Sequence, residues 1–151
     1  ELASKAKEIA VKCVETIDGV GVFGVESFLT KDNRILINEI APRPHNSGHY
    51  TIEACYTSQY ENAIRAILGL PLGSTDMLLN GACMINILGE KEGSSTPVDI
   101  TKSLENGKTS LHLYNKKQSR VGRKIGHVTA VANSVEEAIK NANDMVEKIV
   151  W

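Results

Sequence analysis

Two glutamates, Glu26 and Glu39, occupy positions from which their carboxylates could act on one ligand. Residues 21–29 and 36–40 are rich in Val, Ile, Leu and Phe, a composition that predicts two strands. The polar segment 30–34 between them is typical of a turn. The sequence therefore predicts a β-hairpin that carries one acidic residue on each strand.

The register of this hairpin decides whether the two acids meet. Asp32-Asn33 tolerates the positive φ angles of a two-residue type I′ turn. With that turn, Lys31 pairs with Arg34. Counting outward along both strands then places Glu26 directly opposite Glu39, with Cβ atoms about 5 Å apart.

Facing carboxylates predict a magnesium–nucleotide site. Like charges opposite each other destabilise a sheet unless a cation lies between them or one group keeps its proton. Magnesium takes carboxylate oxygens, often one or two of them together with substrate phosphates. The alternative is an ordinary hairpin whose acids point to solvent, because a longer turn would shift the register by one residue and separate the pair.

A dense polar run follows the second predicted strand. Residues 38–49 read Asn-Glu-Ile-Ala-Pro-Arg-Pro-His-Asn-Ser-Gly-His. Arg43 lies between two prolines, which restrict the backbone, and its guanidinium suits an oxyanion such as bicarbonate or phosphate. His45 and Asn46 offer hydrogen bonds to a second substrate. The alternatives are a loop that caps its own backbone and, less favoured for want of a close ligand pair, a zinc site from His45, His49 and Cys55.

A third polar feature is a basic stretch. Residues 106–135 contain no Asp or Glu, and Gly122 and Gly126 allow a ligand to approach the backbone. This composition predicts a phosphate site, with a solvated basic hairpin as the alternative. Nucleic acid is disfavoured, because Tyr114 is the one aromatic residue of the stretch and the net charge of the chain is −1. The basic residues are Lys108, Lys116, Lys117, Arg120, Arg123 and Lys124.

Length and composition limit the class of protein. The chain has 151 residues, 42% hydrophobic and 23% charged, which suits one domain or two small ones with a core. No apolar run approaches the roughly 20 residues that span a bilayer, and no signal peptide is evident. Three cysteines without close spacing indicate thiols of a reducing compartment rather than a disulfide framework. Because the first residue is Glu rather than Met, we expect a longer parent protein.

The remaining patterns predict an α+β fold. Apolar spacing predicts a helix over residues 2–17. Two capping boxes, Ser58 with Glu61 and Ser134 with Glu137, predict two more helices. Further strands are expected at residues 81–88, 110–114 and 125–131, and a helical turn at 101–105. The final helix is expected to bury Ala138, Ile139, Ala142, Met145, Val146 and Ile149.

A domain division is expected near residues 73–76. The segment Gly69-Leu70-Pro71-Leu72-Gly73 ends the second helix and is typical of a boundary. Residues 1–73 would form one domain. Residues 76–151 would form a small, mainly β domain closed by the C-terminal helix.

The acid pair and the Pro-Arg that follows it resemble the ATP-grasp superfamily. Longer strings resemble more specifically the 5-(carboxyamino)imidazole ribonucleotide synthase family of purine biosynthesis, particularly its fungal form. In that form the synthase is the N-terminal part of a bifunctional phosphoribosylaminoimidazole carboxylase. These strings are residues 38–51, 57–61, 65–73, 114–116 and 122–127. The resemblance covers essentially the whole chain and implies that residues 1–73 are the C-terminal half of an ATP-grasp domain.

The resemblance implies a magnesium–ATP role for the hairpin. Glu26 and Glu39 would bind magnesium, and Asn38 with Glu39 would contact ATP. Many members of the wider superfamily have an asparagine ligand two residues after the second glutamate, where this chain has Ala41. We therefore expect water or phosphate to complete the coordination.

The resemblance also implies where the other substrates bind. Arg43, as the catalytic residue, would line the site for bicarbonate and aminoimidazole ribonucleotide together with His45 and Asn46. Lys116 and Arg123 would hold the phosphate of the ribonucleotide. Lys117, Arg120 and Lys124 are expected to be bystanders.

The implied reaction is ATP-dependent carboxylation of the amine of aminoimidazole ribonucleotide through carboxyphosphate. The chain has no glycine-rich phosphate-covering loop and no lid lysines, so we expect it to be inactive without the N-terminal and lid domains of the same protein. The full protein is expected to be cytoplasmic and homo-oligomeric, with no nucleic-acid or membrane partner. The alternatives are a formate-using or biotin-carboxylating ATP-grasp ligase and a non-catalytic nucleotide-binding module.

Overall fold

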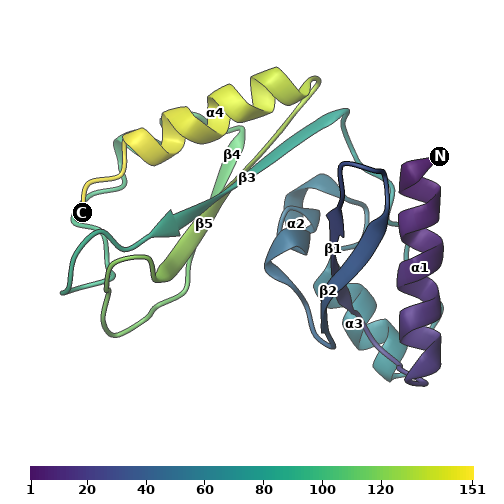
Figure 1. The fold of residues 1–151 in the computed structure, drawn as a ribbon. Helices are drawn as coiled ribbons and strands as arrows, with labels where there is room; N and C mark the ends of the chain where they lie inside the picture. The colour runs from purple at the N-terminus through teal and green to yellow at the C-terminus, as the bar shows by residue number, and fades with distance from the viewer. The chain divides into compact units, whose positions relative to one another are not determined.

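The computed structural model describes all 151 residues, which form two compact units. The first comprises residues 1–52 and 56–75, and the second comprises residues 53–55 and 76–151. Both units combine helices with antiparallel strands (Figure 1), in agreement with the predicted α+β class.

The first unit is built on a hairpin with a helix beside it. Helix α1 (Leu2–Thr16) fills the range predicted from apolar spacing. In Figure 1 it runs alongside strands β1 (Gly24–Leu29) and β2 (Ile35–Ala41). Leu2 and Ala6 of the helix line a shallow apolar cavity together with residues of both strands. Ala6, Ile9 and Cys13 on its apolar side are half-buried, and no residue of the helix is fully buried.

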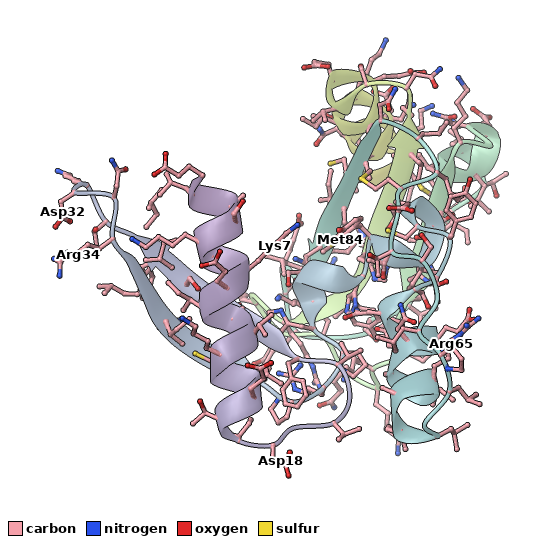
Figure 2. All side chains as sticks on the ribbon, turned by 90° about the vertical axis from the view of Figure 1, so that its right-hand side faces the viewer. Lys7, Asp18, Asp32, Arg34, Arg65 and Met84 are labelled. Carbon is pink, nitrogen blue, oxygen red and sulfur yellow. The ribbon has the colours of Figure 1, made fainter.

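The turn of the hairpin is one residue longer than predicted. Thr30 donates its backbone N–H to the Arg34 carbonyl at 2.9 Å, which leaves three residues in the loop rather than two. Asn33 takes the left-handed position of this loop, with φ 58°. Arg34 Nε donates to Asp32 Oδ2 at 2.7 Å, and Figure 2 shows both side chains at the tip of the hairpin. The predicted pairing of Lys31 with Arg34 is therefore wrong.

A β-bulge cancels this shift before it reaches the acids. On the turn side of the bulge Ser27 pairs with Ile37, and on the other side Glu26 pairs with Glu39. The extra residue on β2 is Asn38, which stands between the two registers. The predicted pairing of Glu26 with Glu39 is confirmed, although a different combination of turn and bulge produces it.

The segment after β2 contains two short helices that were not predicted. They are the 3-10 helix η1 (Asn46–Gly48) and helix α2 (Thr51–Ala54). Helix α3 (Gln59–Ile67) begins as predicted, because Ser58 Oγ accepts the backbone N–H of Glu61 at 3.2 Å. The polar run after β2 is therefore folded back on itself rather than extended.

The second unit is a three-stranded antiparallel sheet covered by one helix. Its order is β3-β5-β4, with β5 (Lys124–Ala132) between β3 (Gly81–Leu88) and β4 (Thr109–Leu113). The boundaries of these three strands lie within one residue of their predicted positions, whereas β1 begins three residues later than predicted. The 3-10 helix η2 (Lys102–Glu105) occupies the predicted helical turn.

Helix α4 (Val135–Glu147) covers this sheet with one apolar face. Ser134 Oγ accepts the backbone N–H of Glu137 at 3.2 Å, as predicted. Ile139 is 46% exposed, so its predicted burial is wrong. It lies about 100° around the helix from the buried Ala138, outside the row that faces the sheet. The predicted residues that do join the core are Ala138, Ala142, Met145 and Ile149, with Val146 packed against it.

Two further observations bear on the predicted class of protein. No helix combines the length and the apolar character that crossing a membrane requires. Cys13, Cys55 and Cys83 are free thiols. Burial raises the pKa of the Cys55 and Cys83 thiols, so both favour the neutral form.

Candidate active site

Glu26 and Glu39 occupy directly opposed positions on β1 and β2. Both residues are exposed, and the side chain of Glu26 keeps 48% of its surface accessible. Asn38 Nδ2 lies 3.5 Å from Glu26 Oε2, at the outer limit of a hydrogen bond. The bulge thus aims the amide of Asn38 at the Glu26 carboxylate.

His45 reaches the same carboxylate from the loop after β2. Its side chain packs over Gly24, where an added Cβ would lie 2.7 Å from the Cβ of His45. Its Nε2 lies 3.4 Å from Glu26 Oε1, and its side chain is 14% exposed. Nδ1 lies 2.8 Å from Ser47 Oγ, which restrains rotation of the ring. Glycine in the strand therefore leaves the space in which the imidazole meets the acid.

Two further expected substrate residues, Arg43 and Asn46, lie on either side of this histidine in the sequence. Arg43 is exposed, and its Nη1 donates to the Pro44 carbonyl at 3.1 Å. A guanidinium with five N–H groups therefore keeps most of its donors for an anion. Asn46 begins η1 and is half-buried.

The hairpin offers a metal two carboxylates. No group of three or more His, Cys, Asp or Glu side chains in the chain is arranged to hold a metal. Ala41 is 4% exposed and contributes no ligand atom from its side chain. Magnesium keeps several waters and uses one or two carboxylates with substrate phosphates, so Glu26 and Glu39 fit it. A structural zinc site needs four ligands, so the alternative set His45, His49 and Cys55 finds no support.

In the second unit, the loop between β4 and β5 carries the expected phosphate ligands. Arg123 is half-buried, and its Nη1 donates to the Gln118 carbonyl at 3.0 Å. Its own carbonyl accepts from Gly89 N–H at 2.8 Å. Lys116 is exposed, and its carbonyl accepts from Ser95 Oγ. Neither cation has a carboxylate within ion-pair distance, so both charges are available to an anion.

A polar cluster that was not predicted adjoins this loop. The Tyr114 hydroxyl lies 2.8 Å from His127 Nδ1. The rings of His127 and His112 stack with centroids 4.4 Å apart, and His112 Nε2 lies 2.6 Å from Glu53 Oε1. The two histidines face each other in the register of β4 and β5. That register was the signal in the sequence, but strand boundaries uncertain by one residue conceal it.

Comparison with known proteins assigns both units to one family. The ATP-grasp domain matches residues 1–60, and the phosphoribosylaminoimidazole carboxylase C-terminal domain matches residues 82–141. The chain is 50% identical to the N5-carboxyaminoimidazole ribonucleotide synthetase from Thermotoga maritima. It matches that crystal structure with a TM-score of 0.87, over 99% of this chain and 42% of that chain. The chain belongs to the N5-carboxyaminoimidazole ribonucleotide synthase family.

Fungal members of this synthase family are similarly close. The phosphoribosylaminoimidazole carboxylase from Schizosaccharomyces pombe is 47% identical over 90% of this chain and 26% of its own length. The N5-carboxyaminoimidazole synthase from Aspergillus clavatus, solved with ADP and 5-aminoimidazole ribonucleotide, is 41% identical. Its TM-score is 0.82 over 95% of this chain and 39% of that chain. The chain thus spans about a quarter of the fungal relative's length and about two fifths of the solved synthase chains.

The matched ranges place the candidate residues within the synthase framework. Glu26, Glu39 and His45 lie in the range matched by the ATP-grasp domain. Lys116 and Arg123 lie in the range matched by the C-terminal domain. The fold is therefore the C-terminal part of an ATP-grasp domain followed by a small β-rich domain with a C-terminal helix.

Proposed function

We propose that the chain is part of an ATP-dependent ligase that carboxylates the amine of aminoimidazole ribonucleotide with bicarbonate. The observation that carries this proposal is the opposed pair of Glu26 and Glu39, with His45 against Glu26, in a member of the synthase family. The solved Aspergillus clavatus relative with ADP and 5-aminoimidazole ribonucleotide supports the same substrates here.

The hairpin would serve the nucleotide. Glu26 and Glu39 would hold magnesium, which when bound neutralises charge on the transferring phosphates. Asn38, next to Glu39 and aimed at Glu26, would contact ATP. Because these groups sit on two hydrogen-bonded strands, their spacing is set before the nucleotide arrives, which favours electrostatic catalysis.

Arg43 would act on the first chemical step. A bicarbonate oxygen attacks the γ-phosphorus, the new O–P bond forms as the bond to ADP breaks, and carboxyphosphate results. A guanidinium binds a planar oxyanion through two parallel N–H groups, which both holds bicarbonate in line and offsets its charge. Arg43 keeps donors for this role, since one of its nitrogens bonds the adjacent Pro44 carbonyl.

The second step joins the carboxyl group to the ribonucleotide. The amine nitrogen attacks the carboxyl carbon, the C–N bond forms, the C–O bond to phosphate breaks, and one amine proton is released. His45 and Asn46 would orient the ribonucleotide for this attack. Lys116 and Arg123 would hold its phosphate, in keeping with their lack of carboxylate partners.

The test uses the full-length protein that contains this chain. With ATP, magnesium and aminoimidazole ribonucleotide, ADP formation should require bicarbonate and should not occur with formate. Formate-dependent or biotin-dependent ADP formation would replace the proposal with another ATP-grasp ligase. Absence of ADP formation with every substrate would favour a non-catalytic nucleotide-binding module. The 151-residue chain alone should show no turnover, and turnover by it would overturn our expectation that further domains are needed.

The wider context of the chain in its full-length protein is also proposed. The fungal relative is named for the carboxylase activity, and this chain covers 26% of its length. A decarboxylating lyase domain in the same polypeptide would be consistent with both facts. We also propose a cytoplasmic, homo-oligomeric full-length protein. Cell fractionation and the native mass of the full-length protein test these two points.

A further inference from the structure

The side chain of Gln59 holds both backbone groups of His45. Its Oε1 accepts the His45 N–H at 2.9 Å, and its Nε2 donates to the His45 carbonyl at 2.9 Å. Nε2 also lies 3.0 Å from Nδ1 of His49. Gln59 is half-buried at the first position of α3, so one amide on a helix fixes the loop at two of its residues.

The backbone of Gln59 is tied to the same loop. Its N–H donates to Thr51 Oγ1 at 2.9 Å, and the Thr51 hydroxyl donates to the Gly48 carbonyl at 2.6 Å. Gly48 also leaves the space that the amide fills, because an added Cβ would lie 2.5 Å from Gln59 Oε1. Both ends of the loop 45–48 therefore close around Gln59.

This clamp determines where the imidazole points. With its N–H and its carbonyl both bonded to one amide, His45 keeps only side-chain freedom. Ser47 Oγ, 2.8 Å from Nδ1, and Gly24, which lies under the ring, limit that freedom further. The result is the 3.4 Å approach of His45 Nε2 to Glu26 Oε1.

We infer that Gln59 is the positioning residue of the candidate substrate site: it acts through His45 and touches neither substrate nor metal. The inference rests on the proposed function, because it takes His45 as a substrate ligand. A glutamine suits the task because its amide offers one acceptor and two donors in one plane. A carboxylate of the same shape accepts from the His45 N–H but has no donor for the His45 carbonyl.

The test compares Gln59→Ala and Gln59→Glu in the full-length protein. Both should lower kcat/KM for aminoimidazole ribonucleotide by at least about tenfold, with KM for ATP changed by less than about twofold, because misplacement affects the substrate that the loop orients. Gln59→Glu keeps the volume of the side chain, so its loss would come from the missing donor. Thermal unfolding of each variant confirms that it is folded.

Ser58→Ala is the matched control. It alters the neighbouring residue and removes the cap of the same helix, where Ser58 Oγ accepts the Glu61 N–H, but it leaves the Gln59 amide in place. It should lower the melting temperature and leave kcat/KM unchanged. Equal losses of kcat/KM in Ser58→Ala and Gln59→Ala would show that Gln59 only stabilises the fold, and would overturn the inference.

Two double variants test the path of the effect. Gly48→Ala should reproduce the loss because its Cβ displaces the amide, and it should add little to Gln59→Ala. In a His45→Ala background, Gln59→Ala should no longer lower kcat/KM. Additive losses in either pair would overturn the inference. If the wild-type protein carboxylates the ribonucleotide and Gln59→Ala does so equally well, the inference alone fails. If the wild type has no such activity, the proposed function fails.

Discussion

Nε2 of His45 lies 3.4 Å from Oε1 of Glu26, so an expected substrate ligand contacts an expected magnesium ligand. The contact arises because His45 packs over Gly24, two residues before Glu26 on the same face of β1. Binding of the metal and binding of the substrate should therefore influence each other through these two side chains. Kinetic experiments on either residue need to vary both ligands.

Glu39→Gln in the full-length protein should raise the magnesium concentration for half-maximal ADP formation by at least about tenfold. Replacing a residue that only hydrogen-bonds a metal ligand already lowers metal affinity by about tenfold or more, and Glu39 is expected to be a ligand itself. The amide keeps the shape of the side chain and removes its charge. A magnesium titration of ADP formation measures the effect. Asp32→Asn is the control, since that carboxylate pairs with Arg34 at the tip of the hairpin. Unchanged magnesium dependence in Glu39→Gln would contradict metal binding by the pair.

Arg43→Lys should raise KM for bicarbonate by at least about tenfold, because an ammonium cannot make the two parallel hydrogen bonds of a guanidinium. KM for ATP should change much less. Initial rates at varied bicarbonate and saturating ATP measure this split. Equal increases in both constants would show that Arg43 serves the nucleotide rather than bicarbonate.

Lys116→Ala and Arg123→Ala should each raise KM for the ribonucleotide by roughly tenfold or more, since a hydrogen bond to a charged group is worth about 1.5–3 kcal/mol. Lys117→Ala in the same loop and Lys124→Ala at the first residue of β5 are matched controls that remove the same charge. They should leave this KM unchanged. Similar effects in all four variants would indicate a diffuse electrostatic role instead of two specific ligands.

The thiols of Cys55, which is buried, and Cys83, which is half-buried, should react slowly with iodoacetamide. Burial raises the pKa of Cys55 above its ordinary value, and the negative charge of Asp76 raises it further. Burial also raises the pKa of Cys83. Because the thiolate is the nucleophile, both should be alkylated more slowly than glutathione at pH 8, as followed by mass spectrometry. Asp76→Asn should accelerate Cys55 and leave Cys83 unchanged. Acceleration of both thiols would mean that the variant had loosened the fold.

His112→Ala should lower the free energy of unfolding by about 1–3 kcal/mol, because it leaves the Glu53 carboxylate without its hydrogen-bond donor. The Glu53 side chain is 19% exposed, and its other oxygen, Oε2, has no hydrogen-bond partner. Urea unfolding of the 151-residue chain measures the loss. In a Glu53→Ala background the same substitution should cost less, and an unchanged cost would show that the pair contributes little.

The sequence predicted the opposed acids for a partly wrong reason. Strand composition located β1 and β2, but residue types alone did not distinguish a two-residue turn from the three-residue turn in which Asn33 is left-handed. The bulge at Asn38 was equally invisible, because no glycine or proline marks it. The two departures cancel, so the pairing of Glu26 with Glu39 was correct while the local geometry was not.

Contacts between segments that are distant in the sequence were not predicted, for a related reason. Ser58 was predicted as a cap because capping is local, whereas the bonds of Gln59 to His45 join residues 14 apart through a fold of the loop. The stacking of His112 on His127 likewise depends on a strand register that composition leaves uncertain by one residue. The sequence therefore predicted interactions between neighbouring residues, such as the Ser58 cap. It did not predict the long-range contacts that orient the functional side chains.

The bulge on β2 has a consequence for how two neighbouring residues can share a task. In a regular strand, adjacent side chains leave from opposite faces, so Asn38 and Glu39 could not both serve a ligand lying over Glu26. The extra residue removes this restriction, and the added residue in the turn keeps the remainder of the hairpin in step. Adding or removing one residue in the turn alone would shift the pairing register, and Glu26 would no longer lie opposite Glu39. Only a change in the turn that is matched by a change at the bulge would keep the two acids opposed.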